Sequence, residues 1–377
     1  MANDCLNIGI IGAGKISELH ASGYLKHPKA RIVAVADNRA DVAESRAAEW
    51  GAEKYFTDYR DLLQMQEIDA VDIITPHNLH RQMAVESLLA GKHVSVQKPM
   101  ALSEAECDEM IQAEAKSSGH LRVFENFRYY PPLVRAKELL REGAIGDPIS
   151  IRIKSVQGAL KYGWQVPVDT LSWRFDDAQS GGGRVVFDYG YHAFAIAVHM
   201  LGPIEQVFAW IRESKNEKGW VRDAPANISW VHSEGNRQGS WEAMASDEMV
   251  VKSDYWSEDE WFELSGTRGF IWVNRCTGKA LEMPPLVIYA DGKRTEVGLD
   301  QIEWDWGASF RDGMFDFVDS MLAGNHAPLS AVDGKYVLQV ARAVQKSSQV
   351  NSPAVSYTHL RAHETLRYLV CRLLLEK

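Results

Sequence analysis

The feature that most constrains the fold is a short β-type run that ends in a lysine and a proline. Val94 and Val96 alternate with small or polar residues over 93–97, and Lys98 and Pro99 follow at once. Because Pro99 donates no backbone hydrogen bond and favours an extended preceding residue, the pattern predicts Lys98 at the carboxyl edge of a strand. Open α/β sheets bind their ligands at that edge. The run alone also fits a surface lysine at a strand end.

Strand and helix patterns alternate through the first third of the chain. Apolar runs predict further strands at residues 6–11, 31–36, 70–75 and 121–125. Helical patterns lie between them, most clearly after Ser103, where Ser103 and Glu106 have the spacing of a capping box. This alternation predicts a parallel sheet with helices on both faces.

A glycine-containing turn follows the first predicted strand. Gly12 and Gly14 permit a tight turn and close approach of a pyrophosphate to a helix N-terminus, although Ser17 stands where a third glycine is expected. Asp37 ends the second strand, where a carboxylate binds ribose hydroxyls. Together these residues favour NAD binding over an ordinary βα turn. Arg39 could still accommodate the 2′-phosphate of NADP.

The later chain predicts a second domain of a different kind. From Pro148 onward, β-type stretches occur at residues 149–156, 204–211, 227–232, 241–245, 261–264 and 269–273. Because no helix-length apolar pattern separates the later stretches, a largely antiparallel sheet is expected. We predict an α/β Rossmann domain at 1–128 and an α+β domain at 129–355. An uncovered face of the second sheet would pack on a partner subunit in a homodimer or homotetramer, or it would be charged and face solvent.

Two features of the second half carry candidate chemistry. If a helix begins near Asp188, then Asp188 and His192 lie on one helix face, where a carboxylate can orient a general acid–base histidine. The alternative is a helix-capping aspartate beside a structural histidine. The loop before them contains Tyr162, Trp164 and Trp173, which either stack on sugar rings or fill a core or subunit interface.

Composition argues against several classes of function. A net charge of −10 makes nucleic acid an improbable partner, and no apolar run approaches the roughly 20 residues that span a bilayer. The first residues lack the pattern of a signal peptide. The four cysteines are scattered and have no metal-binding spacing, which is typical of a reducing compartment. We therefore expect a cytoplasmic protein without membrane, nucleic-acid or metal partners.

In this order the motifs resemble the glucose–fructose oxidoreductase / inositol dehydrogenase (Gfo/Idh/MocA) family of NAD(P)-dependent oxidoreductases, over residues 7–355. The segments that carry the resemblance are Gly12–Ile16, Asp37, Thr75–His80, Lys98–Pro99 and Asp188–His192. The resemblance implies a Rossmann domain followed by an α+β domain with a large, mostly antiparallel sheet. Two positions depart from the family pattern: Gln97 replaces the usual glutamate, and His77 replaces asparagine or aspartate.

The resemblance also implies roles for single residues. Lys98 would lie beside the nicotinamide and the substrate hydroxyl, with Asp188 and the proton acceptor His192 opposite. The candidate cofactor-binding residues are Gly12, Gly14, Lys15, Ile16, Asp37, Arg39, Thr75, Pro76, Asn78, His80, Gln97 and Lys98. The candidate substrate-binding residues are Asn126, Arg128, Tyr162, Trp164, Trp173 and His192.

The expected activity is hydride transfer between a nicotinamide cofactor and a secondary hydroxyl of a sugar, polyol or glycoside. One alternative is a redox-neutral hydrolysis, elimination or epimerisation of a glycoside, with tightly bound NAD recycled in each turnover. A non-catalytic regulator that binds the cofactor is the third possibility. Residues 356–377 look like a translated sequencing-adapter read-through, so we exclude them from functional reasoning.

Overall fold

The structure, a computed structural model, describes residues 5–216, 218–274, 276–278 and 280–356. Most of the predicted read-through tail, residues 357–377, therefore lies outside the described residues. Ser356 is described, and its backbone N–H donates a hydrogen bond to the Glu205 carbonyl at 3.1 Å.

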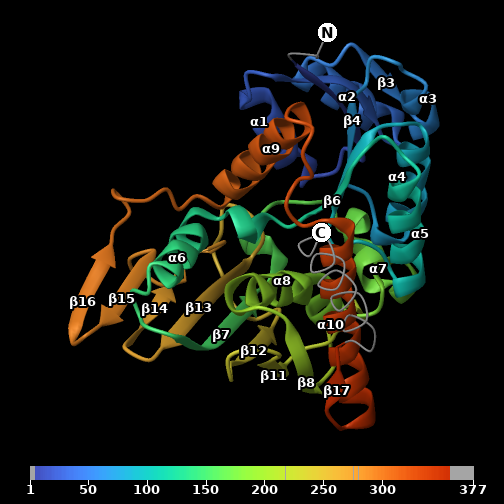
Figure 1. Cartoon of the computed structure of the whole chain (residues 1–377). Coiled ribbons are helices and arrows are strands. Elements are labelled where there is room, and N and C mark those ends of the chain that lie inside the picture. Colours follow the sequence, from blue (N-terminus) through green and yellow to red (C-terminus); the bar gives the residue numbers. More distant parts are fainter. Residues whose placement is uncertain (1–4, 217, 275, 279, 357–377) are drawn as a thin grey trace, which may run out of the picture.

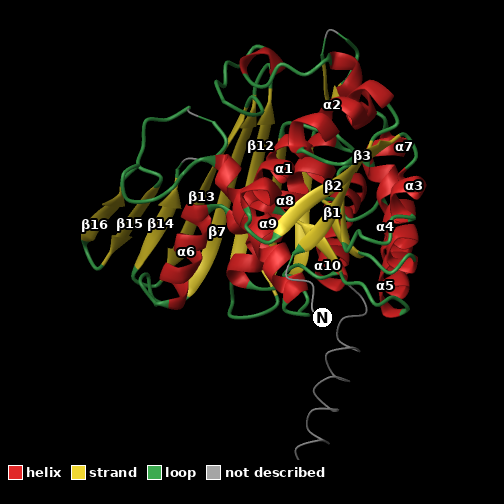
Figure 2. Cartoon of the chain, turned by 90° about the horizontal axis from the view of Figure 1, so that it is seen from above, coloured by secondary structure: helices red, strands yellow, loops and turns green. Residues whose placement is uncertain are grey.

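The N-terminal domain is a six-stranded parallel sheet in the order β3-β2-β1-β4-β5-β6, covered by helices (Figures 1 and 2). Its strands are β1 (Leu6–Ile11), β2 (Ala30–Ala36), β3 (Lys54–Phe56), β4 (Ala70–Ile73), β5 (His93–Gln97) and β6 (Leu121–Phe124). Its helices are α1 (Ser17–Lys26), α2 (Ala40–Trp50), α3 (Tyr59–Leu63), α4 (His80–Leu89) and α5 (Glu104–Ala115), with short η1 (His77–Leu79) and η2 (Asn126–Tyr129). The apolar runs of the central strands are buried because helices cover both sheet faces. The predicted parallel sheet is confirmed.

The C-terminal domain is built on a nine-stranded sheet in the order β16-β15-β14-β13-β7-β12-β11-β8-β17. Neighbouring strands are antiparallel except β7 and β12, which confirms a mostly antiparallel sheet. The strands are β7 (Pro148–Gln157), β8 (Ile204–Ile211), β11 (Ala226–His232), β12 (Gln238–Ala245), β13 (Glu258–Gly266), β14 (Gly269–Val273), β15 (Leu286–Ala290), β16 (Lys293–Val297) and β17 (Ala354–Val355); β9 (Ser214–Lys215) and β10 (Val221–Arg222) form a separate pair.

Helices of the second domain lie against one face of this sheet (Figure 1). They are α6 (Pro131–Arg141), α8 (Gly190–Leu201) and α10 (Ala331–Val350); α7 (Asp177–Ser180), α9 (Trp306–Leu322), η3 (Leu160–Tyr162), η4 (Val168–Phe175) and the π-helical η5 (Arg184–Tyr189) complete the chain. The strands also carry large exposed apolar side chains, among them Trp210 at 53% and Tyr289 at 40% exposure. Such residues suit contact with a partner subunit, and the oligomeric state stays a prediction.

Helix α9 returns from the second domain to pack on α1 of the first (Figure 1). A Cβ atom at Gly23 would lie 2.8 Å from Met314, so glycine permits the close approach of the two helices. The guanidinium of Arg122, at the edge of the Rossmann sheet, donates to the Gly313 carbonyl at 2.7 Å. The predicted boundary at residue 128 stays a prediction, and α9 couples the two domains across it.

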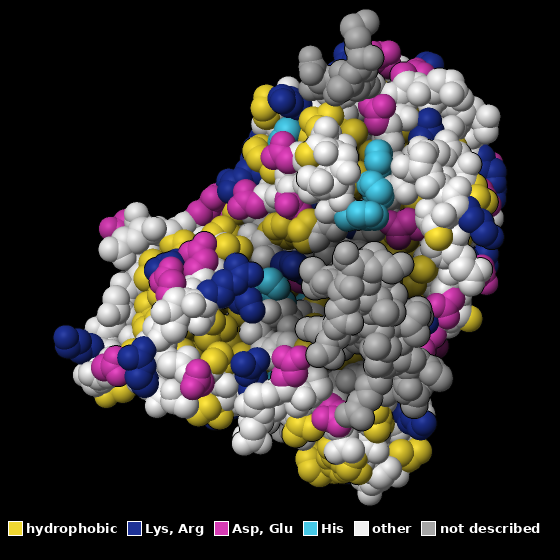
Figure 3. All heavy atoms as spheres, in the orientation of Figure 1, with side chains coloured by type: hydrophobic (Ala, Val, Ile, Leu, Met, Phe, Trp, Pro, Cys, Tyr) yellow, Lys and Arg dark blue, Asp and Glu magenta, His cyan; other side chains and the backbone are white. Residues whose placement is uncertain are grey.

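The surface shows no strong charge separation on the face in Figure 3, where basic and acidic side chains are interspersed. Within the ranges that the structure describes, no helix combines the length and the apolar character needed to cross a membrane.

Candidate active site

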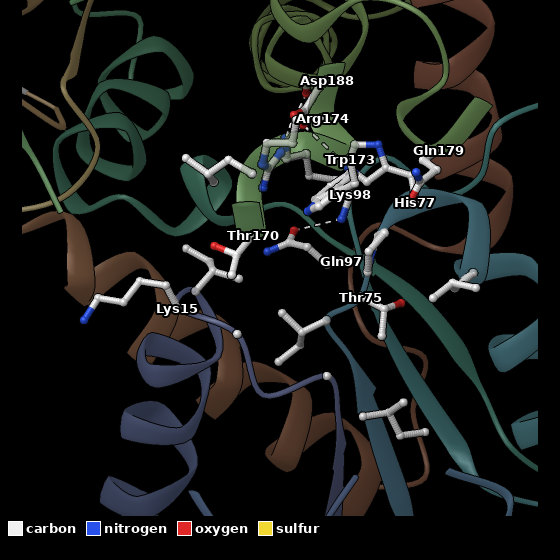
Figure 4. A pocket seen from close by; sticks show the side chains of 18 of the residues that line it. Lys15, Thr75, His77, Gln97, Lys98, Thr170, Trp173, Arg174, Gln179 and Asp188 are labelled. Atoms are coloured by element: carbon white, nitrogen blue, oxygen red, sulfur yellow. Dashed lines mark hydrogen bonds and ion pairs between the residues drawn. The ribbon is translucent and has the colours of Figure 1, made fainter. Parts of the chain in front are cut away.

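A cavity of about 930 Å³ lies between the glycine turn of the Rossmann domain and the C-terminal sheet. Figure 4 shows Lys98, Asp188, Arg174, His77 and Trp173 gathered at one end, with Thr75 farther along the wall. The predicted residues that line the cavity are Gly12, Gly14, Lys15, Ile16, Asp37, Arg39, Thr75, Pro76, Asn78, Gln97, Lys98, Asn126, Trp173, Asp188 and His192. Segments distant in sequence thus share one cavity.

The glycine turn has the backbone shape that a dinucleotide requires. Gly12 has φ +93°, and a Cβ atom there would lie 2.4 Å from the Ile74 carbonyl oxygen. A Cβ at Gly14 would meet no atom within 4 Å, so open space borders the backbone where a pyrophosphate would approach. Ser17, at the third glycine position, is buried, and its hydroxyl donates to the Gly14 carbonyl at 2.5 Å. The turn therefore fits NAD with serine in place of the third glycine.

Asp37 lies at the end of β2 and connects to this turn. Its Oδ2 accepts a hydrogen bond from the Ala13 backbone at 2.9 Å, and its Oδ1 accepts from the Arg39 backbone at 3.0 Å. The carboxylate also lines the cavity, where its remaining acceptor capacity can serve ribose hydroxyls. The Arg39 side chain forms an ion pair with Asp37, with Nε 3.3 Å from Oδ1.

Lys98 follows β5 directly, as the sequence predicts, and points into the cavity. Its buried ammonium donates to the Asp188 carboxylate at 2.7 Å and to the Asp188 carbonyl at 2.8 Å. Burial, assisted by the nearby Arg174 charge, lowers the pKa of Lys98, and the Asp188 charge acts in the opposite direction. An ammonium has three N–H donors, so one remains for a substrate oxygen.

Asp188 holds two cations at once, one on each carboxylate oxygen. Oδ1 accepts from Lys98 and Oδ2 accepts from Arg174. Burial alone would raise the pKa of Asp188, but Arg174 and Lys98 hold it well below its usual range. His77, the unusual residue of the Thr75–His80 segment, lies with Nε2 3.6 Å from Oδ1 of Asp188. Burial lowers the pKa of His77 to about 3, so this neighbour is neutral at physiological pH.

His192 has a different carboxylate partner from the one its spacing suggests. Its Nδ1 is hydrogen-bonded to Glu125, whose other hydrogen bonds come from the Phe127 and Arg128 backbone N–H groups. Because a carboxylate accepts this bond, Nδ1 carries the proton and Nε2 keeps a free lone pair. Burial and the Lys98 charge lower the pKa of His192, against the raising effect of Glu125. A neutral imidazole with a free Nε2 is suited to accept a proton.

Replacing Glu125 by glutamine tests this pairing. The Glu125 charge raises the pKa of His192, so we expect Glu125→Gln to move the acid limb of the kcat/KM profile to lower pH. Loss of a charge-assisted hydrogen bond worth roughly 1.5–3 kcal/mol should reduce turnover by about 10- to 100-fold. The measurement is a pH–rate profile on an active substrate. An unshifted acid limb would separate Glu125 from the proton acceptor.

Four predicted residues lie outside the cavity lining: His80, Arg128, Tyr162 and Trp164. The His80 ring nitrogens lie 2.8 Å from the Pro99 carbonyl and 3.0 Å from the Thr75 carbonyl. His80 therefore contacts both the loop that follows β4 and the loop that follows β5. Trp164 packs against other aromatic rings, including Trp306 at 6.4 Å between centroids. The Trp164 side chain is only half-buried, so its part in substrate binding stays a prediction.

The Gln97 side chain forms a hydrogen bond with the backbone of Lys98 and not with the Lys98 ammonium. Its Oε1 accepts from the Lys98 backbone N–H at 2.8 Å, and its Nε2 lies 3.2 Å from Nε2 of His20. His20 in turn contacts the buried Asp72 through Nδ1 at 2.7 Å. Consecutive side chains at the strand end point in different directions, so the side chain at position 97 does not meet the Lys98 ammonium. With glutamine in place of the usual glutamate, the carboxylate partner of Lys98 is Asp188.

The sequence did not single out several polar residues that line the cavity: Gln157, Arg174, Arg184 and Glu258. Glu125, which holds His192, was likewise missed. A signal for Glu125 existed, because it follows β6 at the same sheet edge as Asp37 and Lys98. A signal for Glu258 existed as well. It belongs to the acidic run Glu258–Glu260, which opens a strand that continues with Trp261 and Phe262. Burial raises the pKa of Glu258 to about 7.

This fold and site define an NAD-binding oxidoreductase with a Rossmann domain followed by a domain built on a mostly antiparallel sheet. The family model "Oxidoreductase family, NAD-binding Rossmann fold" matches residues 6–125, and "GFO/IDH/MocA C-terminal domain" matches residues 133–272. The chain therefore belongs to the Gfo/Idh/MocA family of oxidoreductases.

Curated relatives include dehydrogenases of sugars and polyols. Levoglucosan dehydrogenase of Pseudarthrobacter phenanthrenivorans is 32% identical over 57% of this chain, and this chain spans just 57% of its length. Myo-inositol 2-dehydrogenase of Thermotoga maritima is 25% identical over 91% of this chain and 96% of its own. A solved levoglucosan dehydrogenase in complex with NADH superposes with a TM-score of 0.79 at 23% identity, covering 94% of this chain and 99% of its own. At that identity the structural match shows the shared fold.

Proposed function

We propose that the protein is an NAD-dependent dehydrogenase acting on a secondary hydroxyl of a sugar, polyol or glycoside. The observation that carries this proposal is the meeting of the Lys98–Asp188 and Glu125–His192 pairs in the cavity that begins at the glycine turn. The named relatives support the same substrate class. A non-catalytic regulator would need the cofactor site, but it would need neither of these two side-chain pairs.

The protein's own residues supply positioning and proton transfer. The free Nε2 of His192 accepts the hydroxyl proton, and Glu125 stabilises the imidazolium that results. The third N–H of Lys98 donates to the substrate oxygen as negative charge develops on it, while Asp188 holds the ammonium in place. Bound NAD would supply the hydride acceptor.

A panel of sugars, polyols and glycosides tests the proposal. Each compound is incubated with protein and NAD, and both free NADH and altered carbohydrate are measured. NADH formed in step with an oxidised product supports the dehydrogenase. Altered carbohydrate without NADH would instead support redox-neutral chemistry, and neither product nor NADH across the panel would reject both.

Cofactor preference provides a separate prediction. NAD should bind more tightly than NADP because the Asp37 carboxylate, which lines the cavity, repels a 2′-phosphate. Asp37→Ser should reduce the difference between the affinities for NAD and NADP. It removes the carboxylate charge and leaves Arg39 able to pair with the 2′-phosphate. Fluorescence titrations of wild type and variant with both cofactors measure this. Tighter binding of NADP to the wild type would contradict it.

A further inference from the structure

Arg184 is a cavity-lining cation whose side chain has no hydrogen bond or ion pair with the residues that the structure describes. It stands at the start of η5, four residues before Asp188, and its guanidinium lies 5.4 Å from the centre of the Phe175 ring. The Nε atom is buried and has no hydrogen-bond partner among the described residues. A buried N–H group without a partner costs free energy unless a ligand compensates for its lost hydration.

The carboxylates that interact with Arg184 are engaged by other groups. Asp188 accepts from Lys98 and Arg174, one with each oxygen. Asp223 accepts from the Val185 and Val186 backbone N–H groups, also one with each oxygen. Among the described residues Arg184 forms an ion pair with neither of them nor with Glu258, so its guanidinium remains available to a bound anion.

Two further hydrogen-bonding side chains line the same cavity. Gln157 and Glu258 are opposite one another on the antiparallel strands β7 and β13, and both line the cavity. Residues paired in this way project from the same sheet face with their Cβ atoms about 5 Å apart. The buried Oε1 of Gln157 has no hydrogen-bond partner among the described residues, so it is available to a ligand hydroxyl.

We infer that the substrate is an acidic carbohydrate whose carboxylate pairs with Arg184 and whose hydroxyls reach Gln157 and Glu258. Aldonates, uronates and glycosides of uronic acids belong to this class. The planar guanidinium can bind a carboxylate through two parallel hydrogen bonds. The reacting hydroxyl would then face Lys98 and His192. The inference rests on the proposed function, because it names the class of that enzyme's substrate.

Matched pairs of neutral and acidic compounds test the inference. Suitable pairs are methyl β-D-glucoside with methyl β-D-glucuronide, methyl β-D-galactoside with methyl β-D-galacturonide, and D-glucitol with D-gluconate. Calorimetry on the NADH-loaded full chain measures the ratio of the two affinities in each pair. We expect the acid of at least one pair to bind about 10- to 100-fold more tightly than its neutral partner.

Variants assign the preference to Arg184. Arg184→Gln should bring the acid-to-neutral ratio close to one, and Arg184→Lys should retain part of it. Arg212→Gln removes the same charge from an exposed residue and should preserve the wild-type ratio. Melting temperature and NADH affinity show whether each variant is folded. Arg184→Lys keeps the test decisive if the glutamine variant does not fold.

The inference is overturned if no acid binds more tightly than its neutral partner, if no acid binds at all, or if folded Arg184 variants keep the wild-type ratio. Because the binding ratio involves no redox step, it is independent of the proposed activity. An acid preference without NADH formation would count against the dehydrogenase alone. NADH formation with a neutral preference would count against the acidic substrate alone.

Discussion

His192→Ala is expected to lower turnover by about 10²- to 10⁴-fold, the range for loss of a positioned general base. His192 lies in the cavity, and its hydrogen bond to Glu125 leaves Nε2 free to accept a proton. NAD affinity should stay near the wild-type value because the cofactor residues belong to the Rossmann domain. Turnover is measured on the substrate that proves active, together with an NADH titration.

A second histidine of the same helix supplies a matched control. His199 also lies on α8 but outside the cavity lining, so His199→Ala changes the same residue type without touching the site. We expect it to retain wild-type turnover. If His192→Ala remains within a few-fold of the wild type, His192 is not the proton acceptor.

Lys98→Ala is expected to reduce turnover to a similar extent, because it removes the donor aimed at the developing alkoxide. Its ammonium is held by Asp188 at 2.7 Å, so the loss leaves Asp188 with Arg174 as its principal cation. Cofactor affinity should fall as well, since Lys98 lines the cavity from the Rossmann side. Lys98→Met keeps most of the apolar stem and separates loss of charge from loss of packing.

The double variant shows whether the two residues act as one group. Replacing both Lys98 and His192 should cost little more than either single change, because groups that act as a unit fail together. Single and double variants are compared by kcat/KM. Fully multiplicative effects would indicate that Lys98 and His192 contribute independently, contrary to the proposed mechanism.

The sequence predicted the Rossmann half well because its signals are local. Apolar runs, strand-ending polar residues and the turn at Gly12 and Gly14 each lie within a few residues, and both sheet faces of this domain are buried. The six-stranded parallel sheet and the position of Lys98 after β5 follow from such patterns. The short strand β3 and the edge strand β16 escaped prediction, because exposed strands lack a continuous apolar run. Strand β15 was missed although its sequence, LVIYA, is such a run.

The sequence by itself also named Lys98, Asp188 and His192 as one site, from spacing and from family resemblance. The tertiary structure alone decided which side chains meet. Asp188 pairs with Lys98, 90 residues away, and Glu125 instead of Asp188 holds His192, 67 residues away. Arg184, Gln157 and Glu258 line the cavity for the same reason, because η5 and two strands converge there. Contacts of this kind depend on how elements pack, which local periodicity does not encode.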